Sequence, residues 1–314
     1  MAADGAVAAS RVSARRRTYR ERVQGLLMVL PPVAVVAVFI GFPVGAAVAY
    51  TLGRAGGPNS VVSLLAQRQH VVSHGVTLDA YREVLGTDSV IRDLWVTIWV
   101  TVLTIVFVLA ISWAIALYLR LSNTRLARTV SGLSVVPLFI PVVIASYAIL
   151  IFYRYDGFTK TIAYHLGMHG FPNLGNTLTA VVIGEIWVNV PFGVLMMSSG
   201  LNSVPDALIE SARDAGASLP RTVRSVLLPM NVIPSVIVAT FTGIYVLGSF
   251  TVPYFTGPNS PNLFGPSMTL FFQSFNRPQQ AEVLAMIVFV LAAGIGTVYV
   301  WANVRAQKRA GATR

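Results

Sequence analysis

Six long apolar stretches, separated by polar segments, dominate the pattern of the chain. An α-helix needs about 20 residues to cross about 30 Å of hydrocarbon, and all six stretches are near or above that length. The pattern therefore predicts an all-α integral membrane protein with six transmembrane helices. The stretches are residues 25–52, 94–119, 130–152, 178–201, 232–250 and 283–301.

Composition agrees with this class and argues for one membrane domain. Hydrophobic residues make up 55% of the 314 and charged residues 11%. The mean hydropathy is +0.68, far from the value of a soluble globular domain. No internal repeat interrupts the apolar region. We therefore expect a basic N-terminal tail at 1–24, a six-helix membrane domain at 25–304 and a C-terminal tail at 305–314.

The basic residues predict the orientation of the chain. Sixteen of the 23 Lys and Arg lie before the first span, between the second and third, between the fourth and fifth, or after the last. Cytoplasmic segments carry an excess of these residues, so we expect both termini in the cytoplasm. The net charge of +11 is spread over these four sites. Attraction to anionic membrane lipid explains it more simply than binding to nucleic acid.

Three segments are then expected outside the membrane. The first, 53–93, is expected to hold short surface helices around 63–67 and 78–85, and the second is 153–177. The third, 251–282, carries five prolines and paired aromatic residues. Irregular backbone at membrane depth is tolerated only inside protein or beside a wet cavity. The third segment is therefore either a partly re-entrant cover over a pathway or an ordinary interfacial aromatic belt.

The longest polar run on the cytoplasmic side, 203–229, predicts two short helices broken at a glycine. Ser203 is placed to cap the first helix, with Asp206 three residues on as in a capping box. Gly216 suits the left-handed position after the first helix, and Ser218 with the following proline suits the start of the second. The segment should form a helix–glycine–helix elbow.

The residues of this elbow also match a known pattern. ABC importer permeases carry a cytoplasmic signature of Glu-Ala-Ala, three residues, Gly, nine residues, Ile, one residue and Leu-Pro. The chain resembles this family with the spacing intact, and the two departures, Ser211 for Ala and Val226 for Ile, are conservative. The matching positions are Glu210, Ser211, Ala212, Gly216, Val226, Leu228 and Pro229.

This resemblance implies a type I ABC importer permease in a bacterial cytoplasmic membrane. The elbow would be the coupling helix, with Asp214 on its charged rim, and would dock on a separate ATPase subunit. The implied partners are a second permease subunit, two ATP-binding cassette subunits and an external substrate-binding protein. The chain has two lysines, and neither lies in a phosphate-binding loop. We therefore expect a non-catalytic transport subunit without a cofactor of its own, with ATP and magnesium on the ATPase partners.

The candidate pathway residues are polar or aromatic side chains in or beside the spans. Glu185 is the ionisable residue within them, and a carboxylate there costs on the order of 3 kcal/mol unless it meets a partner or a wet cavity. It either lines the pathway and attracts a cationic solute or hydrogen-bonds structurally to a neighbouring helix. The full candidate set is Glu185, Trp187, Asn189, Tyr147, Phe250 and Tyr254.

The substrate class rests on three further stretches. Residues 135–150, 184–193 and 248–257 resemble the spermidine/putrescine and ferric-iron branch of the family more than the sugar branch. We therefore expect a polyamine-like solute, with a sugar as the alternative. A different class, the ion-coupled secondary transporter, predicts internal repeats and several intramembrane ionisable groups.

Overall fold

The computed structural model describes residues 24–54 and 67–311, and within them it contains helices and no strands. The predicted basic tail lies outside these ranges apart from residue 24, as does the helix expected around 63–67 apart from residue 67. The chain divides into two compact units, Met1–Ala80 and Tyr81–Arg314.

The first unit contains one helix long enough to span a membrane. It runs over Gln24–Thr51, close to the predicted 25–52, and includes a π-helical turn, η1 (Ala37–Gly41), before α2 (Phe42–Thr51). At its end Gly53 has a φ of +87°. The Thr77 amide donates to the Leu52 carbonyl at 2.9 Å, so the following segment folds back onto the helix end.

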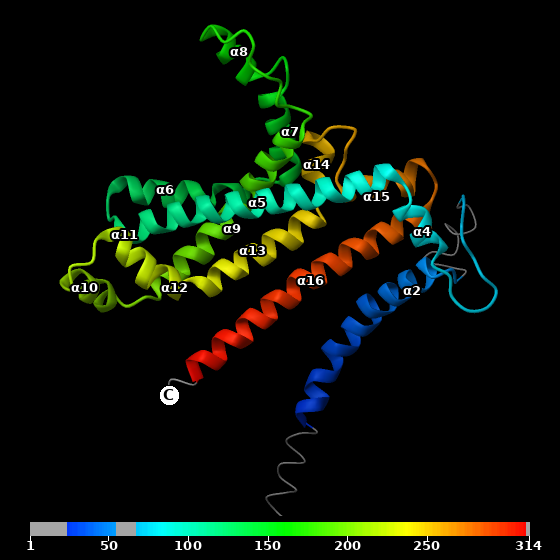
Figure 1. Cartoon of the computed structure of the whole chain (residues 1–314), viewed down its shortest axis with the longest axis horizontal. Helices are drawn as coiled ribbons and strands as arrows, with labels where there is room; N and C mark the ends of the chain where they lie inside the picture. Colours follow the sequence, from blue (N-terminus) through cyan, green and yellow to red (C-terminus); the bar gives the residue numbers. More distant parts are fainter. Residues whose placement is uncertain (1–23, 55–66, 312–314) are drawn as a thin grey trace, which may run out of the picture. The chain divides into compact units, whose positions relative to one another are not determined.

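The second unit is a bundle built around four helices (Figure 1). Helix α5 packs along α9 and α13, and α13 packs along α16. The apolar core between α5, α9 and α13 includes Val108, Met197 and Val238. The helices are α5 (Asp88–Leu121), α9 (Leu178–Asn202), α13 (Val232–Leu247) and α16 (Pro278–Gly311). A short helix, α4 (Asp79–Leu85), lies where 78–85 was predicted.

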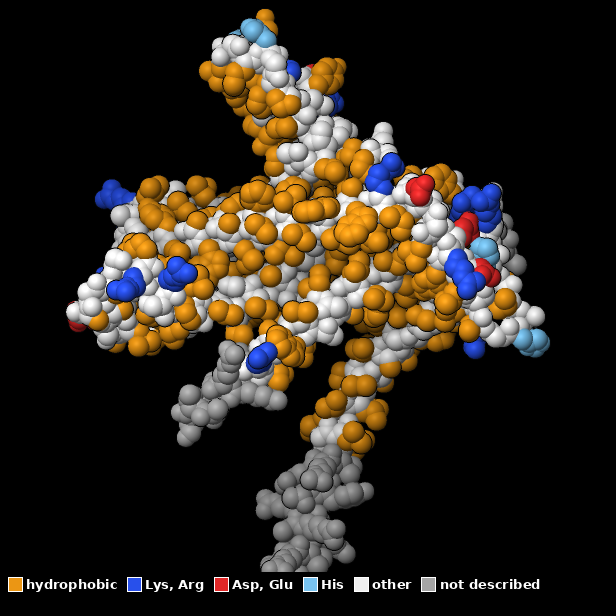
Figure 2. Space-filling view, viewed as in Figure 1, with side chains coloured by type: hydrophobic (Ala, Val, Ile, Leu, Met, Phe, Trp, Pro, Cys, Tyr) orange, Lys and Arg blue, Asp and Glu red, His pale blue; other side chains and the backbone are white. Residues whose placement is uncertain are grey.

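The surface of this unit has the distribution that a bilayer requires. Figure 2 shows apolar side chains covering the middle of the bundle, with Lys and Arg at the end that carries α10 and α11 and again, beside Asp and Glu, at the opposite end. Besides α5, two more of its helices and two bent helix pairs are long and apolar enough to cross a membrane, so two of the six candidate spans in the described ranges are bent pairs. The chain is a multi-pass membrane protein.

The third span is not the single helix predicted over 130–152. It consists of α6 (Arg125–Val135), a 3₁₀ turn η2 (Val136–Phe139) and α7 (Val142–Tyr153), and the two halves meet at 107°. Pro141 causes the break because it has no amide hydrogen and keeps the residue before it out of the helical region. Helix α8 (Phe158–His165) follows α7.

The fifth span is bent by 66° where the elbow meets the bundle. Its first half contains α11 (Leu219–Thr222), a π-helical turn η3 (Val223–Leu227) and α12 (Leu228–Met230). Asn231, at the bend, is fully buried. The second half, α13, begins at the predicted residue 232 and ends at Leu247, three residues before the predicted end.

The elbow has the predicted glycine but not the predicted cap. Helix α10 (Asp206–Asp214) ends before Gly216, whose φ of +76° confirms the left-handed position. The capping box predicted from Ser203 is wrong. Ser203 keeps a helical backbone at the end of α9, so its hydroxyl donates back to the Gly200 carbonyl at 2.7 Å. Pro205 occupies the N-cap position instead, and Ser218 stands at the next N-cap without a side-chain hydrogen bond.

The proline-rich segment after α13 folds back against the bundle. Two short helices, α14 (Thr251–Thr256) and α15 (Phe264–Thr269), are followed by a π-helical turn, η4 (Leu270–Ser274). Val252 and Phe264 are buried. Helix α14 packs against α7 and α9, an arrangement that favours the re-entrant cover over an aromatic belt.

Candidate functional site

Helix α9 carries the buried polar centre of the bundle at Glu185. The preceding residue, Gly184, allows α14 to approach closely, because a Cβ there would lie 2.6 Å from Val252 Cγ1. Glu185 is fully buried. Its nearest polar neighbours are Ser249 and Tyr245, and neither carboxylate oxygen has a partner of normal hydrogen-bond geometry among the described residues.

One helical turn further along α9, Asn189 borders a cavity of about 380 Å³. Its side-chain amide donates to the Glu185 carbonyl at 2.8 Å, which fixes the orientation of the side chain. The Phe192 and Phe241 rings lie 5.7 Å apart between centroids. The cavity is lined by Val188, Asn189, Phe192, Phe241, Ile244 and Tyr245.

This lining can bind a neutral polar solute. Aromatic rings offer apolar faces with defined geometry, and the amide and phenol groups offer donors and acceptors. Small-molecule sites commonly combine a mostly apolar wall with a few placed polar groups. The lining contains no charged side chain, so the cavity itself offers no counter-ion to a cation.

The structure brings together two pairs of the predicted pathway residues. Glu185 and Asn189 share one face of α9, and the Phe250 and Tyr254 rings stack with centroids 4.9 Å apart. Of the six candidates, Asn189 alone lines the cavity. The others are dispersed: Trp187 is half-buried, and Tyr147 on α7 is 54% exposed.

Sequence reasoning missed the aromatic side chains that complete the cavity. Phe192, Phe241 and Tyr245 lie in spans that are apolar on all sides, so one aromatic residue does not stand out from its neighbours. A usable signal existed in the spacing. Phe192 follows Asn189 by three residues, and Tyr245 follows Phe241 by four, which places each pair on one helix face.

The elbow presents its predicted coupling residues on the outside. Ile209 is buried in the core cluster with Leu201 and Leu227 and so holds α10 against the bundle. Two of these coupling residues, Ala212 and Val226, are half-buried. The others are exposed: Glu210, Ser211, Asp214, Gly216, Leu228 and Pro229. The exposed side chains of α10 are small or charged apart from Leu208.

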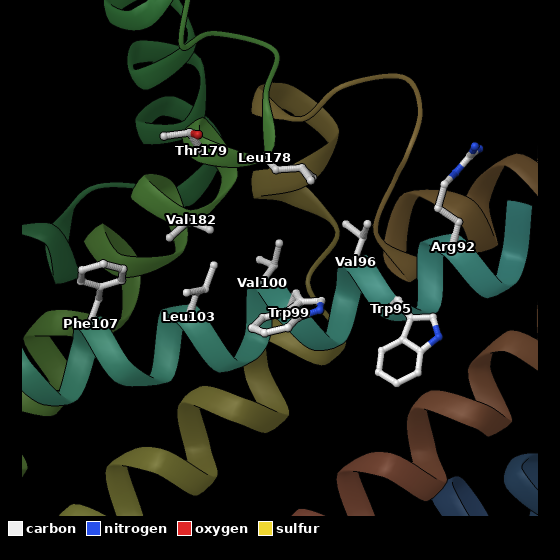
Figure 3. A pocket seen from close by; sticks show the side chains of 10 residues that line it. All are labelled: Arg92, Trp95, Val96, Trp99, Val100, Leu103, Phe107, Leu178, Thr179 and Val182. Carbon is white, nitrogen blue, oxygen red and sulfur yellow. The ribbon is translucent and has the colours of Figure 1, made fainter.

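A second, more apolar groove of about 500 Å³ runs along α5 (Figure 3). Trp95 and Trp99 project from one helix face, and Arg92 marks one end of the groove. The Arg92 guanidinium donates to the Ser260 hydroxyl at 2.9 Å. This lining suits contact with lipid or an apolar helix rather than with a polar solute.

The start of α5 also anchors the cover. The Asp93 carboxylate accepts the Asn262 amide at 3.0 Å and the Ser267 hydroxyl at 2.8 Å. The Thr97 hydroxyl accepts the Phe264 amide at 3.0 Å. These bonds satisfy free amides around the first turn of α15 and tie it to the bundle.

Comparison with known proteins identifies the family. The model of the binding-protein-dependent transport system inner membrane component matches residues 107–310, more than half of the chain. The trehalose/maltose transport system permease protein MalF of Thermococcus litoralis is 27% identical over 294 residues, which cover 90% of this chain and 94% of that protein. The trehalose transport system permease protein SugA of Mycobacterium tuberculosis is 29% identical over 243 residues, which cover 72% of this chain and 73% of that protein.

Solved structures agree on the fold. A bacterial ABC transporter that imports the acidic polysaccharide alginate has a chain with a TM-score of 0.73 and 16% identity, covering 93% of this chain and 99% of that one. A chain of an inward-facing methionine ABC transporter has a TM-score of 0.55 and 22% identity, and the match covers 69% of this chain and 94% of that one. At these identities the likeness concerns the fold. With the family match, the conclusion is that the chain belongs to the binding-protein-dependent transport system inner membrane components and has the type I ABC importer permease fold.

Proposed function

We propose that this permease subunit imports a sugar, with Asn189 and the aromatic rings around it contacting the solute during passage. The observation that carries the proposal is the uncharged aromatic cavity between α9 and α13. The CH faces of a sugar ring can lie against Phe192, Phe241 or Tyr245, while its hydroxyls exchange hydrogen bonds with the Asn189 amide.

The relatives favour this choice over the polyamine-like solute expected from the sequence. Both permeases described above are named for trehalose or maltose transport, and another relative, 26% identical over 228 residues, is the xylose/arabinose import permease protein XacH of Haloferax volcanii. The physical case for a cation also weakens. Glu185 is fully buried and does not line the cavity, so its carboxylate is better explained as a structural group.

The transport cycle follows from the fold of the family. Two permease subunits would form a pathway that opens alternately to each side by rigid-body motion. Helix α10 would lie on the cytoplasmic side of the membrane, as would both termini, and would dock on an ATP-binding cassette subunit. ATP and magnesium would bind to that subunit. An external binding protein would deliver the solute. This arrangement is supported by a solved alginate ABC transporter in complex with an alginate pentasaccharide-bound periplasmic protein, whose chain has a TM-score of 0.71.

Reconstitution tests the proposal. The complete transporter in liposomes, with its ATPase subunits and binding protein, should accumulate labelled trehalose or maltose only with ATP inside. The Asn189→Leu variant should reduce this uptake at least about tenfold, the effect of losing about 1.4 kcal/mol of binding to the solute in passage. Uptake of putrescine in preference to every sugar tested would overturn the substrate class. Uptake driven by an ion gradient without the ATPase subunits would overturn the mechanism.

A further inference from the structure

One arginine joins the coupling helix to two long helices of the bundle. Arg120 lies in the last turn of α5, and its side chain is 17% exposed. Its Nε donates to the Leu201 carbonyl at 3.1 Å, and one Nη donates to the Val204 carbonyl at 3.1 Å. The same Nη also pairs with the Asp206 carboxylate. Arg120 therefore holds together the end of α5, the end of α9 and the first turn of α10.

Each of these bonds meets a local need of the backbone. The last carbonyls of a helix have no partner within the helix, and a cation at the C-terminal end interacts favourably with its dipole. For α9, Arg120 supplies both the hydrogen-bond donor to the Leu201 carbonyl and the positive charge at the C-terminal end of the helix. At the other end of the joint, Asp206 is the acidic residue in the first turn of α10, where negative charge is favoured. The guanidinium thus links a helix end to a helix start.

The geometry requires an arginine. A guanidinium offers several donors in a rigid planar fork, whereas the ammonium of lysine is a compact charge on a flexible chain. Two different nitrogens of Arg120 reach carbonyls three residues apart while one of them also meets a carboxylate. Lysine would keep the charge and lose the fork.

The contacts of Arg120 with Leu201, Val204 and Asp206, called the clamp from here on, bear on how α10 can move relative to the bundle. Helices α9 and α10 are separated only by residues 203–205, and Ile209 adds an apolar contact. Glu210 and Arg213, on the outer part of α10, share with Arg120 a recess of about 160 Å³. Among the described residues, the ion pair between α5 and α10 in this recess is the one between Arg120 and Asp206.

We propose that Arg120 is a positioning residue that makes α10 move as one body with α5 and α9. A displacement of α10 by a docked ATPase would then shift α9, which forms one wall of the cavity, together with α5, which packs along α9. Without the clamp, α10 could rotate about the short 203–205 link while the bundle stayed behind. The proposal rests on the proposed role of α10 as the coupling helix.

A distance measurement tests the clamp separately from transport. The chain has no cysteine, so Ala114→Cys on α5 and Ala207→Cys on α10, both at exposed positions, give one spin-label pair in this chain, which is measured in a complex whose other subunits carry no reactive cysteine. Arg120→Lys should broaden the distance distribution between the labels about twofold or more, because the single nitrogen of an ammonium cannot reproduce the spacing of the two guanidinium nitrogens that reach the Leu201 and Val204 carbonyls. Arg128→Lys, an exposed position on α6, is the matched control and should leave the distribution unchanged.

The functional readout is the number of solute molecules imported per ATP hydrolysed. Arg120→Lys should lower this ratio about fivefold or more, the scale of a typical coupling free energy between sites, while Arg128→Lys keeps the wild-type ratio. Asp206→Asn removes the negative charge from one of the three acceptors and should give an intermediate effect. It also tests the clamp if the Arg120→Lys variant fails to assemble. Unchanged distances and an unchanged ratio in the assembled variants would overturn the clamp. If the wild-type complex imports no sugar but the distances change as expected, the proposed substrate fails and the clamp stands.

Discussion

Gly200 of α9 and Asn231 at the bend before α13 lie so close that a methyl group on Gly200 would overlap the Asn231 side-chain oxygen. The added Cβ would also lie 2.5 Å from Pro234 Cγ. Asn231 in turn donates to the Met197 carbonyl at 3.4 Å. The absence of a side chain at Gly200 is what lets the bent fifth span seat against α9.

Gly200→Ala should therefore destabilise the bundle by about 1 to 3 kcal/mol, the usual cost of overpacking a core. Thermal unfolding of the purified protein in detergent measures the effect. Gly294→Ala is the matched control because it adds the same methyl group on α16 with nothing within 4 Å, and alanine is the better helix former. Equal melting temperatures for the two variants would mean that the bend relaxes without strain.

Glu185→Gln separates the structural role of this residue from a role in the pathway. Because the carboxylate is fully buried away from the cavity, the neutral amide should leave sugar uptake within about twofold of wild type and should not lower the complex yield, since an isolated buried charge is costly. Uptake and yield are measured in parallel. A tenfold loss of uptake in a well-assembled Glu185→Gln complex would return the carboxylate to the pathway.

Gly216→Val should insert normally and abolish transport, because a β-branched residue is a strong outlier at a φ of +76°. No atom lies within 4 Å of the Cβ position, so crowding inside the subunit cannot cause the defect. Gly216→Asn is the matched control, since asparagine tolerates the left-handed region. We expect transport to survive in the asparagine variant. Wild-type transport by the valine variant with ATPase bound would remove α10 from coupling.

Asp93→Leu should loosen the cover by removing the two carboxylate oxygens that accept from Asn262 and Ser267. Hydrogen bonds to a charged group contribute about 1.5 to 3 kcal/mol each, so loss of the bonds to Asn262 and Ser267 should raise amide exchange across 258–270. Asp93→Asn, which keeps one acceptor oxygen, should give a smaller increase. The control is Asp88→Asn, an exposed position in the first turn of the same helix. Equal exchange in all three variants would show that the Asp93 carboxylate does not hold the cover.

Prediction from the sequence succeeded for features that depend only on residues close together in the chain. Span lengths followed from hydropathy, and Gly216 followed from local helix-ending chemistry, because neither depends on the rest of the chain. The bend at Pro141 was hidden inside a run whose composition still suits one span. Ser203 was predicted to cap the start of α10, but it lies at the end of α9. A serine between two helices can bond to either one, and the backbone conformation at that residue determines which. The clamp at Arg120 joins residues more than 80 positions apart, for which no local pattern exists.

The anchor at Asp93 has a consequence for the order in which the chain is made. Its partners in the cover, Asn262 and Ser267, are separated from it by 169 and 174 positions. At about 5 to 20 residues per second, a ribosome reaches them roughly 8 to 35 s after it has added the aspartate. During that interval α5 is already synthesised, while the carboxylate lacks both of these partners. The cover therefore closes late in biogenesis, and a chain truncated before residue 262 would leave the Asp93 carboxylate, near the start of α5, without these two partners.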